Sequence, residues 1–443
     1  MRKVIIFLIF LSFCISQLSG LAVAAPIEPP FTPTCNAIYI INTDTNTVIY
    51  QKNANQKVYP ASLTKLMTAI LTFEKFKNKL DTVVTISHED TDPVRGTGSN
   101  YLTPGEQLTV NQLLYCLLME SANEAANALG RTVAGNVDDF VVMMNKKAQE
   151  IGAKDTNYVN THGLQDPNHY TTAYDTYLIA KYAMQYDVLK TIVSTNKYDF
   201  PQTNKHPAHS ISNTNTLLNS NSKYYLKYVQ GIKTGTTTDA GTCLASYAIK
   251  SGYTYYCVAM GGPKQVDATT NVANNLAFSE TKSLYQWVFN TFVFTPLVQK
   301  QEPQAPIKVL LAWKTNEILL YPEKEYDALI PKKSDLSKVS VVPHVPVSIQ
   351  APIKAGQIIG NADVYFNGQK MGNVKLVSKD DVALSQPLYF LYITGNFFNS
   401  KWFKLLCIFL VFAFSMYILI PFFMSRKKNF INSKQGKRYH LKK

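Results

Sequence analysis

The periodicity of apolar residues divides the first 300 positions into helical and extended segments. Apolar residues recur at helical spacing directly after Ser62, and the same pattern predicts further helices at 110–129, 138–152, 173–185 and 268–290. Short runs rich in β-branched and aromatic residues predict strands at 36–50, as a hairpin, and at 226–234, 242–249 and 254–260. Because helices and strands do not alternate strictly, we expect an α/β (α+β) domain with an antiparallel sheet and surrounding helices.

The pattern changes to short strands and turns beyond a polar, proline-containing stretch at 300–305. Asn367-Gly368 lies between two strand-like runs there and is a strong hairpin signal. We therefore divide the body of the chain into a main domain at 26–299, a linker at 300–305 and a small all-β domain at 306–385.

Both ends of the chain carry long apolar runs. Two basic residues, an apolar stretch and small residues before Pro26 predict a signal peptide at 1–25. Residues 405–424 carry no charge and would span about 30 Å as a helix, which predicts a transmembrane helix. Residues 386–404 form the predicted juxtamembrane segment, and the basic tail at 425–443 is expected to stay in the cytoplasm.

The formal net charge of +14 comes almost entirely from these ends. Residues 1–25 hold two basic residues and residues 401–443 hold ten, with no acidic residue in either segment. The rest of the chain therefore carries only about +2, which does not indicate a nucleic-acid surface. No cysteine or histidine spacing is typical of a metal site, and we expect neither a metal nor a cofactor.

The pattern Ser-x-x-Lys is candidate chemistry, because a lysine three residues along a helix can take the proton of a serine nucleophile. Only Ser62 opens an apolar helix and precedes two further polar motifs, so we select Ser62 as nucleophile and Lys65 as its base. Ser279 is the strongest competitor, since it also lies in a predicted helix. The pattern begins at five places in all: Ser62, Ser194, Ser220, Ser279 and Ser425.

Ser121-Ala122-Asn123 is the second motif. A serine and an asparagine two residues apart at a helix end can both face a cleft. There Ser121 could relay a proton to a leaving amine, and the Asn123 amide could hold a substrate carbonyl.

Lys233-Thr234-Gly235 is the third motif and ends a predicted strand. Lys233 and Thr234 offer a positive charge and a hydroxyl to a carboxylate, while Gly235 permits the close approach of another backbone. The charge of Lys233 near Lys65 would also favour the unprotonated form of that lysine.

Together the three motifs resemble those of the penicilloyl serine transferases, which share a fold with the serine β-lactamases. Within that group the chain is most similar to the low-molecular-mass penicillin-binding proteins, the serine-type D-Ala-D-Ala carboxypeptidases. The similarity covers about residues 36–385. It includes the segments Tyr59–Thr68, Glu120–Ala126, Met144-Asn145, Asn160–Leu164 with His169, Gly231–Thr237 and Ala351–Gln357.

The resemblance implies a mechanism for a peptidoglycan stem that ends in D-Ala-D-Ala. Ser62 would be acylated by the penultimate D-alanine carbonyl, with Lys65 as base, and water would release the shortened peptide. The oxyanion hole would consist of the backbone N–H groups of Ser62 and Thr236. The terminal carboxylate would be held by Lys233, Thr234 and Thr237.

The resemblance also implies partners and a location. A β-lactam would mimic the D-Ala-D-Ala end and leave a slowly hydrolysed acyl-enzyme. The protein would be a single-pass protein of the bacterial cell membrane, with its catalytic domain on the extracytoplasmic side. Thr214 stands where many relatives carry an arginine, so carboxylate binding would depend more on Lys233. His162, His169 and Asp175 are expected to be structural.

Three other functions remain open from the sequence. A β-lactamase of the well-known class needs a glutamate between the second and third motifs, and no glutamate occurs between Glu150 and Glu280. A transpeptidase or an endopeptidase would use the same acyl-enzyme with a different acceptor. A non-catalytic wall-binding scaffold would have no need of the complete set of nucleophile, base and Lys-Thr-Gly.

Overall fold

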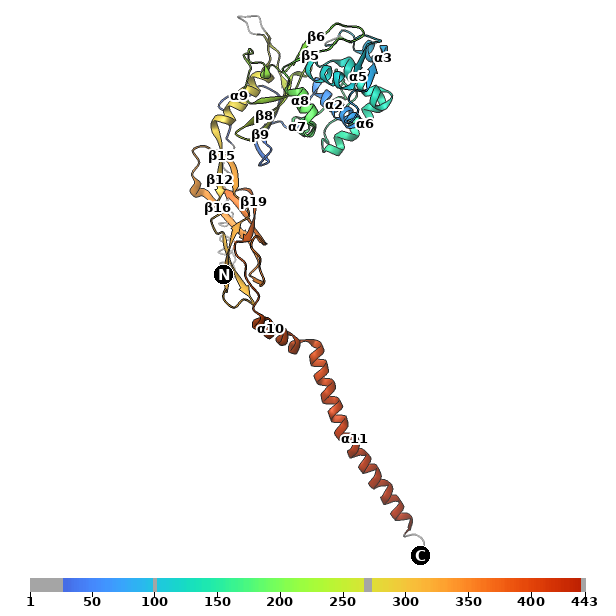
Figure 1. Cartoon of the computed structure of the whole chain (residues 1–443), viewed down its shortest axis with the longest axis vertical. Coiled ribbons are helices and arrows are strands. Elements are labelled where there is room, and N and C mark those ends of the chain that lie inside the picture. The colour runs from blue at the N-terminus through green and yellow to red at the C-terminus, as the bar shows by residue number, and fades with distance from the viewer. Residues whose placement is uncertain (1–26, 99–101, 267–272, 440–443) are drawn as a thin grey trace, which may run out of the picture. The chain divides into compact units, whose positions relative to one another are not determined.

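The computed structural model describes residues 27–98, 102–266 and 273–439 (Figure 1). The predicted signal peptide lies outside these residues. The chain divides into two compact units, which are described separately. The first contains the described residues up to Thr295 together with Ala328–Ser334, and the second contains Pro296–Asp327 and the described residues from Asp335 onward.

A five-stranded antiparallel sheet forms the centre of the first unit, as the sequence predicts. The strand order is β2-β1-β9-β8-β7, so β7 lies at one edge. Their bounds are β1 Ala37–Asn42, β2 Thr47–Lys52, β7 Val229–Thr237, β8 Gly241–Lys250 and β9 Tyr253–Gly262.

Helices cover both faces of this sheet, because successive residues of a strand point to opposite faces. Ala37, Tyr39 and Ile41 of β1 pack into a large core with the helices on one side. Ile38 and Ile40 pack into a second core with α9 on the other side. The helices are α2 Lys65–Phe76, α3 His88–Thr91, α4 Val110–Tyr115, α5 Asn123–Ala134, α6 Val137–Ile151, α7 Ala173–Ala183, α8 Asp187–Ser194 and α9 Leu276–Thr291.

The single helix predicted at 110–129 is wrong, because the structure breaks it. After α4 the chain forms a π-helical turn at Cys116–Glu120, and Ser121 then adopts a left-handed conformation with φ of 66° before α5 begins. The amide of Ala122 donates to the Cys116 carbonyl across this break. The apolar spacing runs through the interruption, and therefore does not reveal it.

Short strand pairs complete the first unit. They are β3 Val83–Thr85 with β4 Gln107–Thr109, β5 Lys197–Phe200 with β6 His209–Ser212, and β10 Gln265–Val266 with β11 Ala273–Asn274. The helix predicted at 268–290 begins only at Leu276 in the structure, where the side chain of Asn275 accepts a hydrogen bond from the amide of Phe278.

The second unit contains a six-stranded sheet, which confirms the predicted all-β domain. The hairpin at Asn367-Gly368 is also confirmed, and both residues have positive φ, as such a turn requires. The predicted linker ends where β13 begins, at Ala305. The sheet order is β16-β18-β19-β14-β13-β17, with β13 Ala305–Leu310, β14 Glu317–Pro322, β16 Val339–His344, β17 Ser348–Gln350, β18 Ile358–Phe366 and β19 Gln369–Ser378. A separate pair, which belongs wholly to neither unit, is β12 Phe292–Val298 with β15 Tyr326–Pro331.

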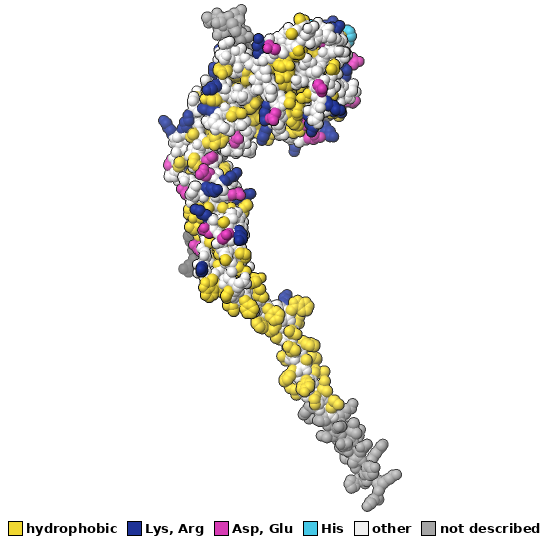
Figure 2. Space-filling view, viewed as in Figure 1, with side chains coloured by type: hydrophobic (Ala, Val, Ile, Leu, Met, Phe, Trp, Pro, Cys, Tyr) yellow, Lys and Arg dark blue, Asp and Glu magenta, His cyan; other side chains and the backbone are white. Residues whose placement is uncertain are grey.

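Two helices end the described chain, α10 Gln386–Asn399 and α11 Lys401–Tyr439. Within α11, Lys401–Pro421 is long and apolar enough to cross a membrane. Hydrophobic side chains cover α10 and this part of α11 (Figure 2). The predicted juxtamembrane segment is thus mostly helical, and the predicted span falls within one helix.

Candidate active site

Ser62 and Lys65 lie side by side at the start of α2. Ser62 belongs to a 3₁₀ turn, Ala61–Thr64, and Lys65 is the first residue of the helix. Residues three apart nearly eclipse each other in a 3₁₀ turn. The Nζ atom of Lys65 therefore lies 2.9 Å from the Oγ atom of Ser62.

Two acceptors hold Lys65 in a fully buried position. Its Nζ donates to the Oδ1 atom of Asn123 at 2.6 Å and to the carbonyl oxygen of His162 at 2.8 Å. Burial holds the pKa of Lys65 well below its ordinary value, and the nearby charge of Lys233 lowers this pKa further, against an opposing effect of Glu124. The surroundings therefore favour the neutral amine, which is the form that can accept a proton.

The competing Ser-x-x-Lys at Ser279 lacks this geometry. The Ser279 hydroxyl donates to carbonyls of its own helix, those of Asn275 and Leu276. The Nζ atom of Lys282 donates to the carbonyl oxygen of Lys223 at 2.8 Å. Here the same sequence pattern gives a helix-bound hydroxyl and a lysine directed elsewhere.

Ser121 and Asn123 reach the same cleft because of the break between α4 and α5. Both side chains line it, as does Ser62. The Nδ2 atom of Asn123 donates to the carbonyl of Thr97 at 2.7 Å and to its hydroxyl at 3.1 Å. Both polar atoms of the Asn123 amide already have protein partners, so this side chain fixes the position of the Lys65 amine.

The edge strand β7 supplies the opposite wall. Lys233 is buried, its Nζ donates to the carbonyl of Thr234 at 3.0 Å, and burial lowers the pKa of Lys233 to about 7. The hydroxyl of Thr234 lies 2.8 Å from that of Thr214. Thr236 and Thr237 continue the wall, and the hydroxyl of Thr237 accepts from the amide of Ala240 at 3.0 Å.

Two glycines let other segments pack directly against the turn that carries Ser62. A Cβ atom on Gly235 would lie 3.1 Å from the amide nitrogen of Ser62. A Cβ atom on Gly163, where φ is +89°, would lie only 1.8 Å from the carbonyl oxygen of Ala61. Ala61 itself has a positive φ of 47°. The position of Ser62 thus depends on two segments far away in the sequence.

The loops around the cleft are held by hydrogen bonds to the side chains of His162, His169 and Asp175. Nδ1 of His169 accepts from the amide of Val159, which leaves Nε2 to donate to the hydroxyl of Thr64 at 2.8 Å. Burial lowers the pKa of His162 to about 3 and that of His169 to about 4, so both rings are neutral near pH 7.

The cleft has a volume of about 330 Å³. It brings together residues of all three motifs, with the side chains of Lys65 and Lys233 buried behind it. Sequence reasoning missed several lining residues, and also Thr97, which holds Asn123, because each of them lies outside the three motifs. The missed lining residues include Gly98, Asn275 and Phe278.

Comparison with known proteins gives the family. A family model described as D-alanyl-D-alanine carboxypeptidase matches residues 24–264, more than half of the chain. The chain belongs to the D-alanyl-D-alanine carboxypeptidase family. A second model, described as the C-terminal domain of penicillin-binding protein 5, matches residues 295–384. The protein is therefore a serine-type carboxypeptidase of this family, with the two-part architecture of its penicillin-binding members.

Individual relatives agree with this assignment. The D-alanyl-D-alanine carboxypeptidase DacF of Bacillus subtilis is 31% identical over 356 residues, 80% of this chain and 87% of the relative. DacC of Escherichia coli is 28% identical over 80% of this chain and 83% of its own length. The crystal structure of penicillin-binding protein 5 from Haemophilus influenzae matches with a TM-score of 0.62 and 27% identity, over 81% of this chain and 99% of that one.

Proposed function

We propose that this protein removes the terminal D-alanine from peptidoglycan stems ending in D-Ala-D-Ala, through an acyl-enzyme on Ser62. The hydrogen bond between the buried Lys65 amine and the Ser62 hydroxyl carries the proposal. Because burial favours the neutral amine, Lys65 takes the hydroxyl proton as Ser62 attacks the penultimate carbonyl.

The oxyanion that forms in this attack is stabilised by the backbone N–H groups of Ser62 and Thr236. Two observations support this pair. The amide of Ser62 lies against Gly235, so β7 and the nucleophile turn are in contact. In addition, β7 pairs on one side only in the described sheet, and an edge strand directs alternate N–H groups away from its neighbour.

The terminal carboxylate binds at Lys233 and Thr234, where a buried cation lies beside a hydroxyl. Thr214 contacts the Thr234 hydroxyl and can orient it. The hydroxyl of Thr237, at the end of this wall, also binds the carboxylate. The same hydroxyl accepts a hydrogen bond from the amide of Ala240. Ser121, which lines the cleft, relays the proton to the leaving D-alanine amine.

A β-lactam reacts at the same serine, because its amide and carboxylate mimic the D-Ala-D-Ala end, and it leaves a slowly hydrolysed acyl-enzyme.

The apolar helix Lys401–Pro421 anchors the protein in the cell membrane. Ten basic residues and no acidic one lie between position 401 and the end of the chain, eight of them beyond the apolar helix, which keeps the tail in the cytoplasm and the catalytic domain outside.

The test is D-alanine release from diacetyl-Lys-D-Ala-D-Ala by the full-length protein in detergent. We expect release by the wild type, none by Ser62→Ala, and normal release by Ser279→Ala, the matched variant of the competing Ser-x-x-Lys. Absence of release by the wild type would refute the carboxypeptidase assignment. Release only with an added amine acceptor would indicate a transpeptidase, and rapid repeated turnover of penicillin would indicate a β-lactamase.

A further inference from the structure

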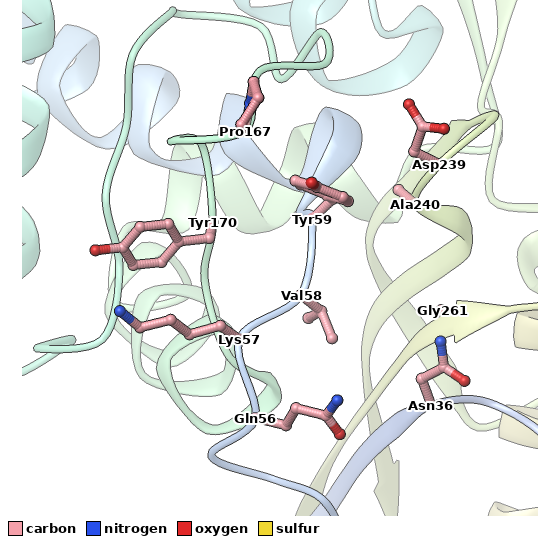
Figure 3. A pocket seen from close by; sticks show the side chains of 10 residues that line it. All are labelled: Asn36, Gln56, Lys57, Val58, Tyr59, Pro167, Tyr170, Asp239, Ala240 and Gly261. Carbon is pink, nitrogen blue, oxygen red and sulfur yellow. The ribbon is translucent and has the colours of Figure 1, made fainter.

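A large apolar ring is exposed at one end of the sheet in the second unit. Charged residues are usually exposed and tryptophans usually buried. A hollow of the first unit follows this rule, since Lys57 and Asp239, which line it, are both exposed (Figure 3). Trp313 does not follow it, because 73% of this residue is exposed on the loop between β13 and β14. The neighbouring Leu310, at the end of β13, is exposed as well.

This loop is joined to the start of α10. The carbonyl oxygen of Leu311 accepts a hydrogen bond at 2.8 Å from the amide of Ser385, the residue from which α10 begins. A second contact lies beside the first. Gln350, which is the register partner of Leu310, donates to the hydroxyl of Tyr392 at 3.4 Å. The chain therefore leaves the sheet for its apolar helices at the same end that carries the exposed tryptophan.

The helix α10 is built to contact lipid. None of its 14 residues is charged, and large apolar side chains such as Phe390 are exposed on it, so transfer of its surface from water to lipid is favourable. The extended backbone of Ser400 separates α10 from α11, and Phe397 packs against Phe403 across this break. Because of the break, α10 can lie along the bilayer surface while α11 crosses the bilayer. The first turn of α10, and the loop joined to it, then lie at the level of the lipid headgroups.

We propose that the loop between β13 and β14 is a second membrane contact, in which Trp313 enters the headgroup region of the bilayer that α11 crosses. The inference rests on the membrane anchoring that is part of the proposed function. Tryptophan suits this region, because its ring is apolar and its N–H group can bond to headgroups. The next residue, Lys314, is exposed and can place its ammonium group among anionic phosphates. The two contacts together hold this end of the second unit on the bilayer surface.

The three tryptophans of the chain provide the probes. Trp287 is buried in the first unit, Trp402 belongs to the apolar helix Lys401–Pro421, and Trp313 is the residue under test. The full-length protein would be placed in phosphatidylcholine–phosphatidylglycerol nanodiscs with or without brominated acyl chains, which quench the fluorescence of nearby tryptophans. Wild type would be compared with Trp313→Phe, with Trp402→Phe and with the double variant.

Brominated lipid should leave the double variant unquenched, because only the buried Trp287 remains in it. Trp402→Phe, which keeps Trp313, should be quenched about half as strongly as Trp313→Phe, which keeps Trp402 in the span. The rate of penicillin acylation should equal that of wild type in all variants, which shows that the catalytic cleft is intact.

Leu336→Trp, made in the double variant, is the matched control. Leu336 is 48% exposed, so a tryptophan there is also accessible. It precedes β16, whose first residue, Val339, pairs with Phe366 at the opposite end of the sheet. Brominated lipid should therefore not quench this tryptophan.

Four results would overturn the proposal. Quenching of Trp313→Phe but not of Trp402→Phe would refute the loop contact alone. Equal quenching of the Leu336→Trp control would show that the whole sheet lies along the bilayer. Emission from Trp313 that changes with protein concentration in detergent would assign the loop to contact with a second copy of the chain. Absence of quenching in wild type would refute the membrane anchoring, and the loop contact with it.

Discussion

Gly163→Ala should disable the nucleophile through a single added methyl group. The new Cβ atom would lie 1.8 Å from the carbonyl oxygen of Ala61 and 2.8 Å from the hydroxyl of Thr64. The first separation is more than about 1 Å short of van der Waals contact, so the turn that carries Ser62 must move. The residue must also keep a φ of +89°, which an alanine adopts reluctantly.

The structure offers a control that separates these two effects. Gly152 has nearly the same φ, +93°, but a Cβ atom there would meet only a carbon of Leu178 at 3.9 Å. Gly152→Ala should therefore lose about 1 kcal/mol of unfolding free energy from backbone strain alone. Gly163→Ala should lose about 2–5 kcal/mol, because overpacking adds to the same strain.

The effect on catalysis should be larger than the effect on stability. A displacement of about 1 Å at a reacting group can lower a rate about a hundredfold. We therefore expect a penicillin acylation rate at least about a hundredfold lower for Gly163→Ala, and within about threefold of wild type for Gly152→Ala. Stopped-flow acylation and denaturant unfolding measure the two quantities. Equal acylation rates in the two variants would refute the reasoning that Gly163 positions Ser62.

Two further predictions concern charge and packing. Because burial lowers the pKa of Lys233 to about 7, this lysine loses its charge as the pH rises. The kcat/KM for a peptide with a free carboxylate should then fall about tenfold per pH unit on the alkaline side. The methyl ester of the same peptide should show no such decrease in kcat/KM. A flat profile for both substrates would contradict the role of Lys233. Asp175 is buried and accepts from the amide of Asp155 and the hydroxyl of Thr156, both at 2.8 Å, so Asp175→Ala should cost about 2–3 kcal/mol of unfolding free energy. Its acylation rate should stay within about threefold of wild type, and normal melting with lost acylation would show instead that Asp175 serves the chemistry.

Local sequence signals predicted those parts of the fold that local chemistry determines. Asn367-Gly368 predicted a hairpin because few other residues accept positive φ at both positions, and the structure has it. The spacing of Ser62 and Lys65 likewise places both groups on one face of a helix start, where they lie 2.9 Å apart.

The remaining features depend on contacts between distant segments. The break at Ser121 coincides with a hydrogen bond from the amide of Thr214 to the carbonyl of Met119, which no local pattern indicates. The His162 carbonyl reaches the Lys65 amine across 97 residues of sequence. Such contacts complete the site, and they cannot be predicted from residue types or periodicity.

The most direct test of the central claim is the location of the acyl group. The full-length protein would be incubated with penicillin, digested and mapped by mass spectrometry. We predict one penicilloyl group on the peptide that contains Ser62, the same modification in Ser279→Ala and none in Ser62→Ala. A penicilloyl group on any other residue, or one that persists in Ser62→Ala, would contradict the account.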